Sequence, residues 1–363
     1  MDIVTATREY ESWLTRYTNL VPTDLETKHK IMASGPFPFM RATFSRWCQL
    51  WRDKAGHVAD APVVLGVGDI HVENYGTWRD AEGRLAWGVN DFDEACHVPY
   101  TLDLVRLMVS VSLAIDEDSL KLSTATAFAA IIDGYTTQLK RGATPFVLAE
   151  NHAWMRPLAL NSLRDPAHFW KKMLALEPTK SPAPIAAVVA LERMLPQRNL
   201  TYSVRNRVAG IGSLGHARFV AIACYQGGLI AREAKALVPP AIAWTHDEAG
   251  SIEILYQAIL DRAVRCCDPL VSLQSHWIVR RLAPDCSRIE LASLPQERDE
   301  AHILKAMGQE LANVHAGTEG AQAAIIADIE RRKAGWYEPV VTGMLASIQT
   351  DFISWKKFQS DKL

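Results

Sequence analysis

Two short apolar segments of this chain each end in a cluster of acidic and amide side chains, and this pattern constrains the fold more than any other. Residues 63–67 read Val-Val-Leu-Gly-Val and are followed by Gly-Asp-Ile-His-Val-Glu-Asn at residues 68–74. Residues 85–89 read Leu-Ala-Trp-Gly-Val and are followed by Asn-Asp-Phe-Asp at residues 90–93. Short runs of β-branched and aromatic residues predict buried strands. Since mixed α/β proteins carry their chemistry at strand ends, we expect both clusters to belong to one site.

The residue types in these clusters suit a site that holds a metal ion and activates a hydroxyl group. Asp69 is followed five residues later by Asn74, and Asp91 and Asp93 come after the second strand. This arrangement is typical of sites that place a proton-accepting carboxylate beside two Mg²⁺-binding side chains. An Asp at a strand end is often only a turn residue. The combination with Asn74 and Asp91 favours a functional role for Asp69.

Length, charge and cysteine content exclude several classes of protein. The chain has 363 residues, which predicts two lobes or domains. Its 39 basic and 41 acidic residues form no long run of one sign, so we expect no nucleic-acid or anionic-membrane partner. No N-terminal secretory pattern and no apolar run of about 20 residues is present, and the six cysteines have no C-x-x-C spacing. We therefore expect a cytoplasmic protein without a disulfide framework or a zinc site.

Periodicity and turn residues divide the rest of the chain into helical and extended stretches. Residues 144–184 contain six prolines and are expected to be irregular with short helices, packed across one lobe. A hairpin with a turn at Gly227-Gly228 is expected from residues 219–231, and a strand at residues 276–282. Helices are expected at residues 7–19, 39–54, 101–115, 120–140, 186–195, 252–267, 297–315 and 336–355.

A second motif, Gly-Ile-Gly-Ser-Leu-Gly at residues 210–215, lies just before the hairpin. The residues that follow it alternate as in a strand, which does not fit the helix expected after a dinucleotide-binding loop. The context fits a β-turn whose backbone amides cover the phosphates of a nucleotide, although three glycines can also simply make a tight hairpin. The nucleotide-binding residues would be Gly210, Gly212, Ser213 and Gly215.

A phosphate-covering loop needs a cation from the adjacent strand, and two residues compete for this role. Arg232 and Lys235 are three positions apart, so they cannot share one face of a regular strand. A lysine is the usual point charge for phosphates, whereas Arg232 lies at the more usual distance from the glycines. Glu253 on the following helix is available to fix either cation, or it is only an exposed residue at the start of that helix. The sequence leaves the choice open.

These motifs together resemble the bacterial family called domain of unknown function 2252, which belongs to the protein-kinase-like superfamily alongside aminoglycoside and choline phosphotransferases. The similarity covers most of the chain and departs from the family pattern at Arg232, where the family typically has lysine. It is carried by residues 34–41 (Ser-Gly-Pro-Phe-Pro-Phe-Met-Arg), 68–74, 90–94, 103–106 and 210–215.

The resemblance implies roles for individual residues. Asp69 would be the catalytic base, and Asn74 and Asp91 would bind Mg²⁺. Asp93 would share the metal or face the acceptor. His71 resembles the loop histidine of the aminoglycoside phosphotransferases, either touching substrate or orienting the loop. Asp103 resembles their structural Asp, which accepts hydrogen bonds from the backbone of the catalytic loop. We expect Arg41 and Arg106 to be partners of acidic loop residues.

The order of the motifs implies a circular permutation. The catalytic and metal loops precede the glycine loop, whereas an ordinary kinase has them after it. The helix ending Leu-Ala-Asn-Val-His at residues 311–315 resembles the one that leads into the catalytic loop of the phosphotransferases. The expected fold is α+β and two-lobed, kinase-like and permuted, with a mostly helical large lobe and a small antiparallel β lobe. Residues 1–195 would form the catalytic part, 196–285 the nucleotide-binding part, and 286–363 helices returning to the large lobe.

The activity implied is transfer of the γ-phosphoryl group from ATP, with Mg²⁺, to a hydroxyl group of an unidentified acceptor. Three alternatives remain open. A pseudokinase would bind nucleotide and act as an interaction module, which the missing lysine at position 232 favours. An adenylyl transferase would bind ATP in reverse on the same fold. A dinuclear metallophosphoesterase would use Asp69 and His71 with Asn151-His152, and would leave the glycine loop without a role.

Overall fold

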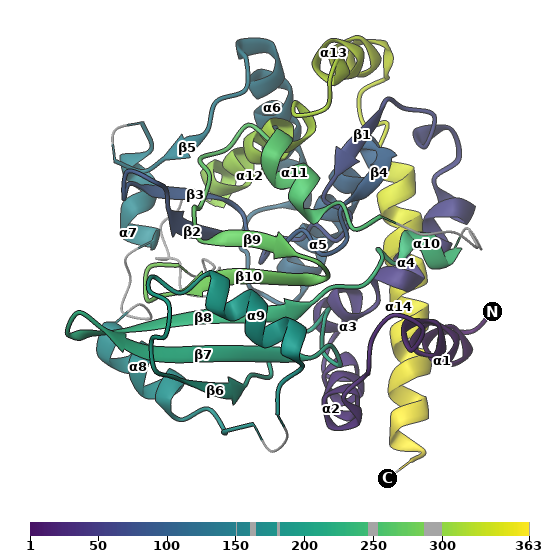
Figure 1. Cartoon of the computed structure of the whole chain (residues 1–363). Helices are drawn as coiled ribbons and strands as arrows, with labels where there is room; N and C mark the ends of the chain where they lie inside the picture. The colour runs from purple at the N-terminus through teal and green to yellow at the C-terminus, as the bar shows by residue number, and fades with distance from the viewer. Residues whose placement is uncertain (150, 160–164, 180–181, 246–252, 287–299, 363) are drawn as a thin grey trace.

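The computed structural model describes residues 1–149, 151–159, 165–179, 182–245, 253–286 and 300–362. As expected, the chain mixes helices with antiparallel sheets. Figure 1 shows most of the helices on one side and a five-stranded sheet on the other. No helix within the described ranges is long and apolar enough to cross a membrane.

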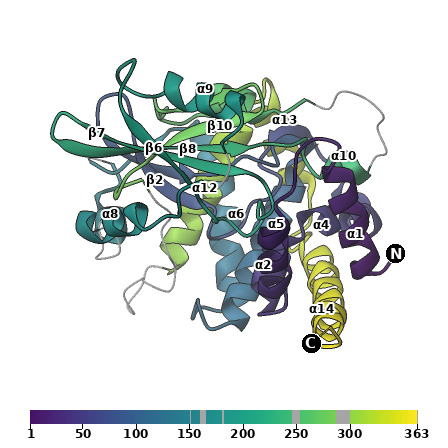
Figure 2. The same ribbon diagram turned by 60° about the horizontal axis from the view of Figure 1, so that its bottom comes forward.

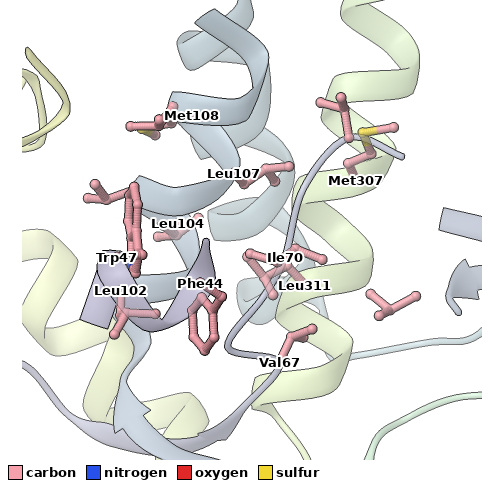
Figure 3. Packing of buried hydrophobic residues seen from close by; sticks show 14 of the residues in the cluster. Phe44, Trp47, Val67, Ile70, Leu102, Leu104, Leu107, Met108, Met307 and Leu311 are labelled. Carbon is pink, nitrogen blue, oxygen red and sulfur yellow. The ribbon is translucent and has the colours of Figure 1, made fainter. Parts of the chain in front are cut away.

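The larger part of the molecule is helical, and its core is organised around one almost fully buried helix, α5 (Tyr100–Asp116). Figure 3 shows Val67 and Ile70 between α5 and α12 (Glu300–His315), so the polar segment after the first predicted strand is anchored by apolar side chains. The other helices of this part are α1 (Ile3–Leu14), α2 (Pro22–Met32), α3 (Pro36–Ala42), α4 (Phe44–Lys54), α6 (Thr124–Arg141), α13 (Ala321–Arg331) and α14 (Glu338–Ser360).

Two small sheets bring the polar clusters together. β1 (Val63–Gly66) pairs with β4 (Cys96–Pro99), and β3 (Leu85–Val89) pairs with β2 (Tyr75–Arg79) and with β5 (Phe146–Val147), all antiparallel. The chain therefore passes from the first sheet to the second through residues 67–74 and returns through residues 90–95. These two polar connections lie side by side, and Asn90 N donates to Asn74 O over 2.9 Å.

The five-stranded antiparallel sheet has the order β6-β7-β8-β10-β9. One helix from the proline-rich region and the helix that follows this region cover the two faces of the sheet, as Figure 2 shows from a second side. Met173 of α8 (Pro166–Leu174) packs on Val220 and Leu282, whereas α9 (Ile185–Arg193) packs on Ala234 and Trp277. The strands are β6 (Tyr202–Asn206), β7 (Arg218–Tyr225), β8 (Gly228–Ala236), β9 (Val271–Gln274) and β10 (Trp277–Leu282).

Several predicted boundaries are wrong for local reasons. The helix expected at 39–54 is two helices, because Thr43 leaves helical geometry with φ −122° and ψ 42°. The helix expected at 7–19 is α1, which ends at Leu14. The hairpin turns at Gln226-Gly227, both with positive φ, since Tyr225 already pairs with Gly228.

The helix expected at 252–267 is reduced to α11 (Tyr256–Arg262), and Ile252 lies outside the described residues, as do residues 297–299 of the helix expected before His315. Shorter elements complete the description: η1 (Gly56–Val58), η2 (Ala153–Met155), α7 (Arg156–Ala159) and α10 (Ile242–Thr245).

Candidate active site

The polar connections of the helical part and the five-stranded sheet enclose a cavity of about 530 Å³. This size suits a nucleotide-sized or drug-sized ligand. Nine of the predicted site residues border or contact it, from segments that are far apart in the sequence. Asp69, His71, Asn74, Asp91, Asp93, Gly210, Gly212 and Ser213 line the cavity, and Lys235 contacts two of them.

Asp69 is fixed by the fully buried Arg106 of α5. Arg106 Nε donates to Asp69 Oδ1 over 2.9 Å, and its Nη2 bonds the same oxygen and also Met40 O. The guanidinium lies over the rings of Phe44 and Trp47, 4.7 and 4.8 Å from their centroids. Arg106 is thus the structural partner expected from the sequence, and it holds one oxygen of Asp69 while Oδ2 remains on the cavity side.

Asp103 of α5 binds the backbone at the start of the connection formed by residues 67–74. Val67 N and Gly68 N donate to its two carboxylate oxygens over 2.7 and 2.9 Å, which confirms the hydrogen bonds expected for this residue. His315, at the end of α12, contacts Asp103 through Nε2 at 3.0 Å. The Asp69 segment is therefore rigidly supported by two buried helices.

Asn74 ties the two polar connections together. Its Nδ2 donates to Asp69 O over 3.3 Å and to Asp91 O over 3.1 Å. These bonds leave the amide Oδ1 as the group of Asn74 that can accept a cation. His71 has a local role, since its Nδ1 accepts from Glu73 N over 3.2 Å, and Glu73 forms an ion pair with Arg41. These contacts fit the loop-orienting function among the two considered for His71.

Lys235 of β8 faces the acidic connection, whereas Arg232 does not. Lys235 Nζ lies 3.1 Å from Asp91 Oδ1 and 2.5 Å from the Asp93 carboxylate. Arg232 projects from the other face of β8, where its Nε donates to Met194 O over 3.0 Å at the end of α9. Glu253, considered as a partner for either cation, is exposed and forms no part of this contact.

The charges of this cluster are strongly perturbed. Burial disfavours ionisation of Asp91, but Lys235, a hydrogen bond with Asp93 and the charge of Arg280 together outweigh burial and lower the pKa of Asp91. Burial and the negative charge of Asp91 raise the pKa of Asp93 to about 7, against the attraction of Lys235. Burial likewise raises the pKa of Glu94 to about 8, although Ala241 N donates to its Oε2 over 2.6 Å. The pocket thus holds more carboxylate than one lysine neutralises, which suits a divalent cation.

The glycine loop covers Asp69 directly. Residues 207–217 join β6 to β7, and a Cβ built on Gly212 would lie 3.4 Å from Asp69 Oδ2, so a side chain there would be in van der Waals contact with the carboxylate. Two contacts from α2 hold the loop down. Lys28 Nζ donates to Gly212 O over 3.2 Å, and Val21 N donates to Gly215 O over 2.9 Å.

Some site residues were missed by the sequence reasoning. Lys28 gives no local signal, because it acts on a loop 184 positions away. Arg218 and Arg280 also line the cavity. Arg280 pairs with Glu233 and Arg218 pairs with Lys235 in neighbouring strands, so all four side chains lie on one face of the sheet. The alternation of side chains along each strand could have placed them there once the strand pairing was known. His168, Phe169 and Lys172 of α8, in the proline-rich region, line the cavity too.

The ligand set expected for a dinuclear metallophosphoesterase is not assembled. His152 packs on the ring of Phe146 with centroids 4.2 Å apart, and His71 is engaged within its own loop. Among the residues that the structure describes, no three of His, Cys, Asp or Glu are grouped to hold a metal ion. Asp91 and Asp93 with the Asn74 amide fit Mg²⁺ better, since this ion is commonly held by one or two carboxylates together with substrate phosphates.

Comparison with known proteins gives one family match. The model of a family described as "Uncharacterized protein conserved in bacteria (DUF2252)" matches residues 20–165, which include both polar connections and Asp103. No curated protein and no solved structure matched the chain. The glycine loop and Lys235 lie outside the matched range.

Proposed function

We propose that this protein is a phosphotransferase that uses ATP and Mg²⁺ and transfers the γ-phosphoryl group to a hydroxyl group of an acceptor. One observation carries the proposal. Lys235, on β8 of the five-stranded sheet, contacts both Asp91 and Asp93, which line the cavity. A cation that would bind phosphate and carboxylates that would hold a metal therefore meet beside the cavity that Asp69 also lines, and phosphoryl transfer requires this set of groups.

The proposal includes a permuted kinase-like fold. In a permuted kinase-like fold, a helix should end beside the connection at residues 67–74, but the chain should not pass from that helix into this connection. α12 ends in this way, because His315 contacts Asp103, and Leu65 N of β1 donates to Thr318 Oγ1 over 2.9 Å. The residues after Thr318 instead lead to α13 and α14, and the chain reaches β1 only from its own N-terminal helices. Such a rearrangement is tolerated when the cut falls in a surface loop.

Each residue then has a defined task. Asp91 and the Oδ1 of Asn74 would hold Mg²⁺, with Asp93 as a further ligand. Backbone amides of residues 210–215 and the ammonium group of Lys235 would hold the phosphates. Bound Mg-ATP supplies the activated phosphoryl group, and Asp69 Oδ2 would accept the proton of the acceptor hydroxyl. Residues of α8 would contact the acceptor, since they line the same cavity.

The geometry also bears on the alternatives. The pseudokinase alternative depended on the absence of lysine at position 232, but Lys235 provides a cation on the cavity side. Adenylyl transfer would use the same groups with the nucleotide reversed. The mass added to the product separates the two reactions, because a phosphoryl group adds roughly 80 mass units and an adenylyl group roughly 329.

The test combines nucleotide binding with one substitution. Mg-ATP should raise the melting temperature of the wild-type protein. Asp69→Asn keeps an acceptor for Arg106 but removes the base, so it should retain this shift while losing about 10²-fold to 10⁴-fold in transfer rate. The exposed Asp60, changed to Asn, is the matched control and should leave both quantities unchanged.

Two results would contradict the proposal. One is a wild-type melting temperature that does not respond to ATP and Mg²⁺. The other is an Asp69→Asn protein that folds with the wild-type melting temperature and transfers phosphoryl groups at the wild-type rate.

A further inference from the structure

Three arginines surround one carboxylate on the cavity side of the five-stranded sheet. Glu233 is fully buried, and it forms ion pairs with Arg207, Arg218 and Arg280. Arg218 Nη1 and Arg280 Nε both donate to Glu233 Oε1, over 3.1 and 2.9 Å. Arg207 contacts the other oxygen, Oε2. One carboxylate therefore forms ion pairs with three guanidinium groups.

Strand geometry explains why these groups converge. Glu233 and Lys235 are two positions apart on β8, so their side chains leave the same face. Arg280 is the neighbour of Glu233 on β10, and Arg218 is the neighbour of Lys235 on β7. Arg207 follows β6 directly, and its N donates to Arg218 O over 3.2 Å. The arginine cluster consequently begins directly beside Lys235, on the same face of the sheet.

The cluster is both positively charged and accessible from the cavity. All three arginines line the cavity, and the side chains of Arg207 and Arg280 are 22% and 20% exposed. Each guanidinium has five N–H groups, and bonds to Glu233 and Ser213 use only one or two on each. Two further acids act on the cluster: Asp91, which Lys235 already engages, interacts with Arg280, and Asp24 interacts with Arg218. The positive charge of this region also acts on His216. Burial, followed by the charges of Lys28, Lys235 and Arg218, lowers the pKa of His216 to about 3.

A structural explanation alone accounts poorly for this arrangement. Two guanidinium groups would be enough to neutralise and orient a buried glutamate, and a third adds repulsion between like charges. Burial is outweighed by the arginines, so the pKa of Glu233 is lowered well below its usual value. Glu233 thus remains ionised, and its ion pairs hold the three arginine side chains in place beside the cavity.

We propose that Arg207, Arg218 and Arg280 form a second anion site, which binds a phosphate group alongside the one at Lys235. Arginine forks match phosphate oxygens in pairs, and the net charge of the cluster calls for a ligand with more than one negative charge. This inference deepens the proposed function, because it assigns a polyphosphate chain or a phosphorylated acceptor to the glycine-loop side of the same cavity.

The test measures binding directly, without turnover. Inorganic triphosphate and ATP are titrated by calorimetry, at low and at moderate salt, into wild-type protein and the Arg207→Gln, Arg280→Gln and Arg193→Gln variants. Arg193 is an exposed arginine of α9 and serves as the matched control. We expect Arg207→Gln and Arg280→Gln each to weaken triphosphate binding at least about tenfold, because each removes a charged hydrogen bond. Arg193→Gln should bind as wild type does.

Competition between ligands identifies the source of the phosphate. If the nucleotide supplies the phosphate group, Arg207→Gln weakens the binding of ATP as much as the binding of triphosphate, and saturating ATP prevents triphosphate from binding. If a phosphorylated acceptor supplies it, ATP binding is unchanged and triphosphate still binds to the ATP-saturated protein. Both results support the second site.

The site is ruled out if folded Arg207→Gln and Arg280→Gln proteins bind triphosphate with wild-type affinity. Arg207 is the more exposed of the two, so Arg207→Gln remains informative if Arg280→Gln fails to fold. Failure of the proposed function looks different. In that case triphosphate binding depends on the arginines, but the wild-type protein transfers no phosphoryl group to any acceptor.

Discussion

Asp93 is a residue whose charge opposes folding near neutral pH. Burial and the adjacent Asp91 raise its pKa to about 7 from the 3.8 of an unperturbed Asp. Between these two values the folded protein binds a proton that the unfolded chain does not. Stability therefore falls as the pH rises through this window, and Asp93 contributes its full penalty above it. Glu94 and Glu310, with pKa values raised by burial to about 8 and about 7, act in the same direction.

Replacing Asp93 by Asn should remove this pH-dependent penalty. At pH 5 only a minor part of the penalty is present, because pH 5 lies near the lower end of this window, so Asp93→Asn should stabilise the protein less there than at pH 8. At pH 8 the variant should be more stable than wild type by roughly 1–3 kcal/mol, because each unit of pKa shift corresponds to about 1.4 kcal/mol. Urea unfolding at the two pH values measures the difference.

The exposed Asp60→Asn variant is the control and should show no difference between the two pH values. An Asp93→Asn protein that is destabilised equally at pH 5 and pH 8 would show that Asp93 is ionised throughout this range. Lys235 would then be the dominant influence on both carboxylates.

At this scale the sequence predicts residue types well and orientation poorly. The Asp69, Asn74 and Asp91 positions could be chosen because they follow recognisable strands. The choice between Arg232 and Lys235 required knowledge of which face of β8 is covered by α9, and periodicity alone does not contain it. Lys28 had no signal, because α2 meets the glycine loop only through the tertiary fold.

The pairing of α6 with α12 decides how firmly the Asp69 segment is supported. Gly308 of α12 lies against the backbone of α6, and a Cβ at this position would be 2.2 Å from Ile131 O. Gly134 of α6 makes the reciprocal approach, where a Cβ would be 2.0 Å from Lys305 O. One helical turn from Gly308, Leu311 packs in the cluster with Ile70 that Figure 3 shows. Moving α12 would therefore move the active-site connection.

Gly308→Ala should destabilise the protein although alanine favours helices. Its methyl group meets backbone atoms, which cannot rotate away, so we expect a loss of at least about 2 kcal/mol in the free energy of unfolding. Gly343 of α14 is the matched control, because a Cβ there meets nothing within 4 Å. Gly343→Ala should increase stability by about 0.5–1 kcal/mol. Thermal and urea unfolding of both variants give the comparison, and equal effects would contradict the close packing.

Long apolar elements were predictable, and short or interrupted ones were not. α5 is apolar around most of its circumference, and a helix is predicted from the sequence at 101–115. The break at Thr43 follows a helix that begins with prolines, and no glycine or proline marks the break itself. β4 and β9 are four residues each and carry few β-branched side chains in alternation, so their pairing partners define them more than their own sequence does.

For the whole molecule, the site exists only while both parts are in contact. Lys28, Gly212 and Asp69 meet at one side of the cavity, and Lys235, Asp91 and Asp93 meet at the other. A nucleotide bound between them should stabilise the parts together. Hydrogen exchange should therefore slow at least about tenfold in the amides of both residues 71–74 and 211–216 when Mg-ATP is added.

AMP is the control, since it lacks the β and γ phosphates and should protect the glycine loop less. Protection of only one of the two segments by Mg-ATP would place the nucleotide away from this cavity. The outcome is measured by mass spectrometry of the labelled protein.

The global arrangement was the least accessible to sequence reasoning. The order of the motifs suggests a permuted kinase-like chain, and this stays a prediction. The expected boundary at residue 195 assigned α8 and α9 to the catalytic part, whereas both helices pack on the five-stranded sheet. A proline-rich stretch predicts irregular structure, but it does not predict whether that stretch packs on the helical part or on the five-stranded sheet.

The closeness of the glycine loop to Asp69 has a consequence for side reactions. Because Lys28 holds the glycine loop over Asp69, the loop should limit the access of bulk water to the carboxylate when no acceptor is bound. We expect ATP to be hydrolysed slowly without an acceptor. Lys28→Met, which frees the loop, should increase this wasteful ATP consumption severalfold, as release of inorganic phosphate would record.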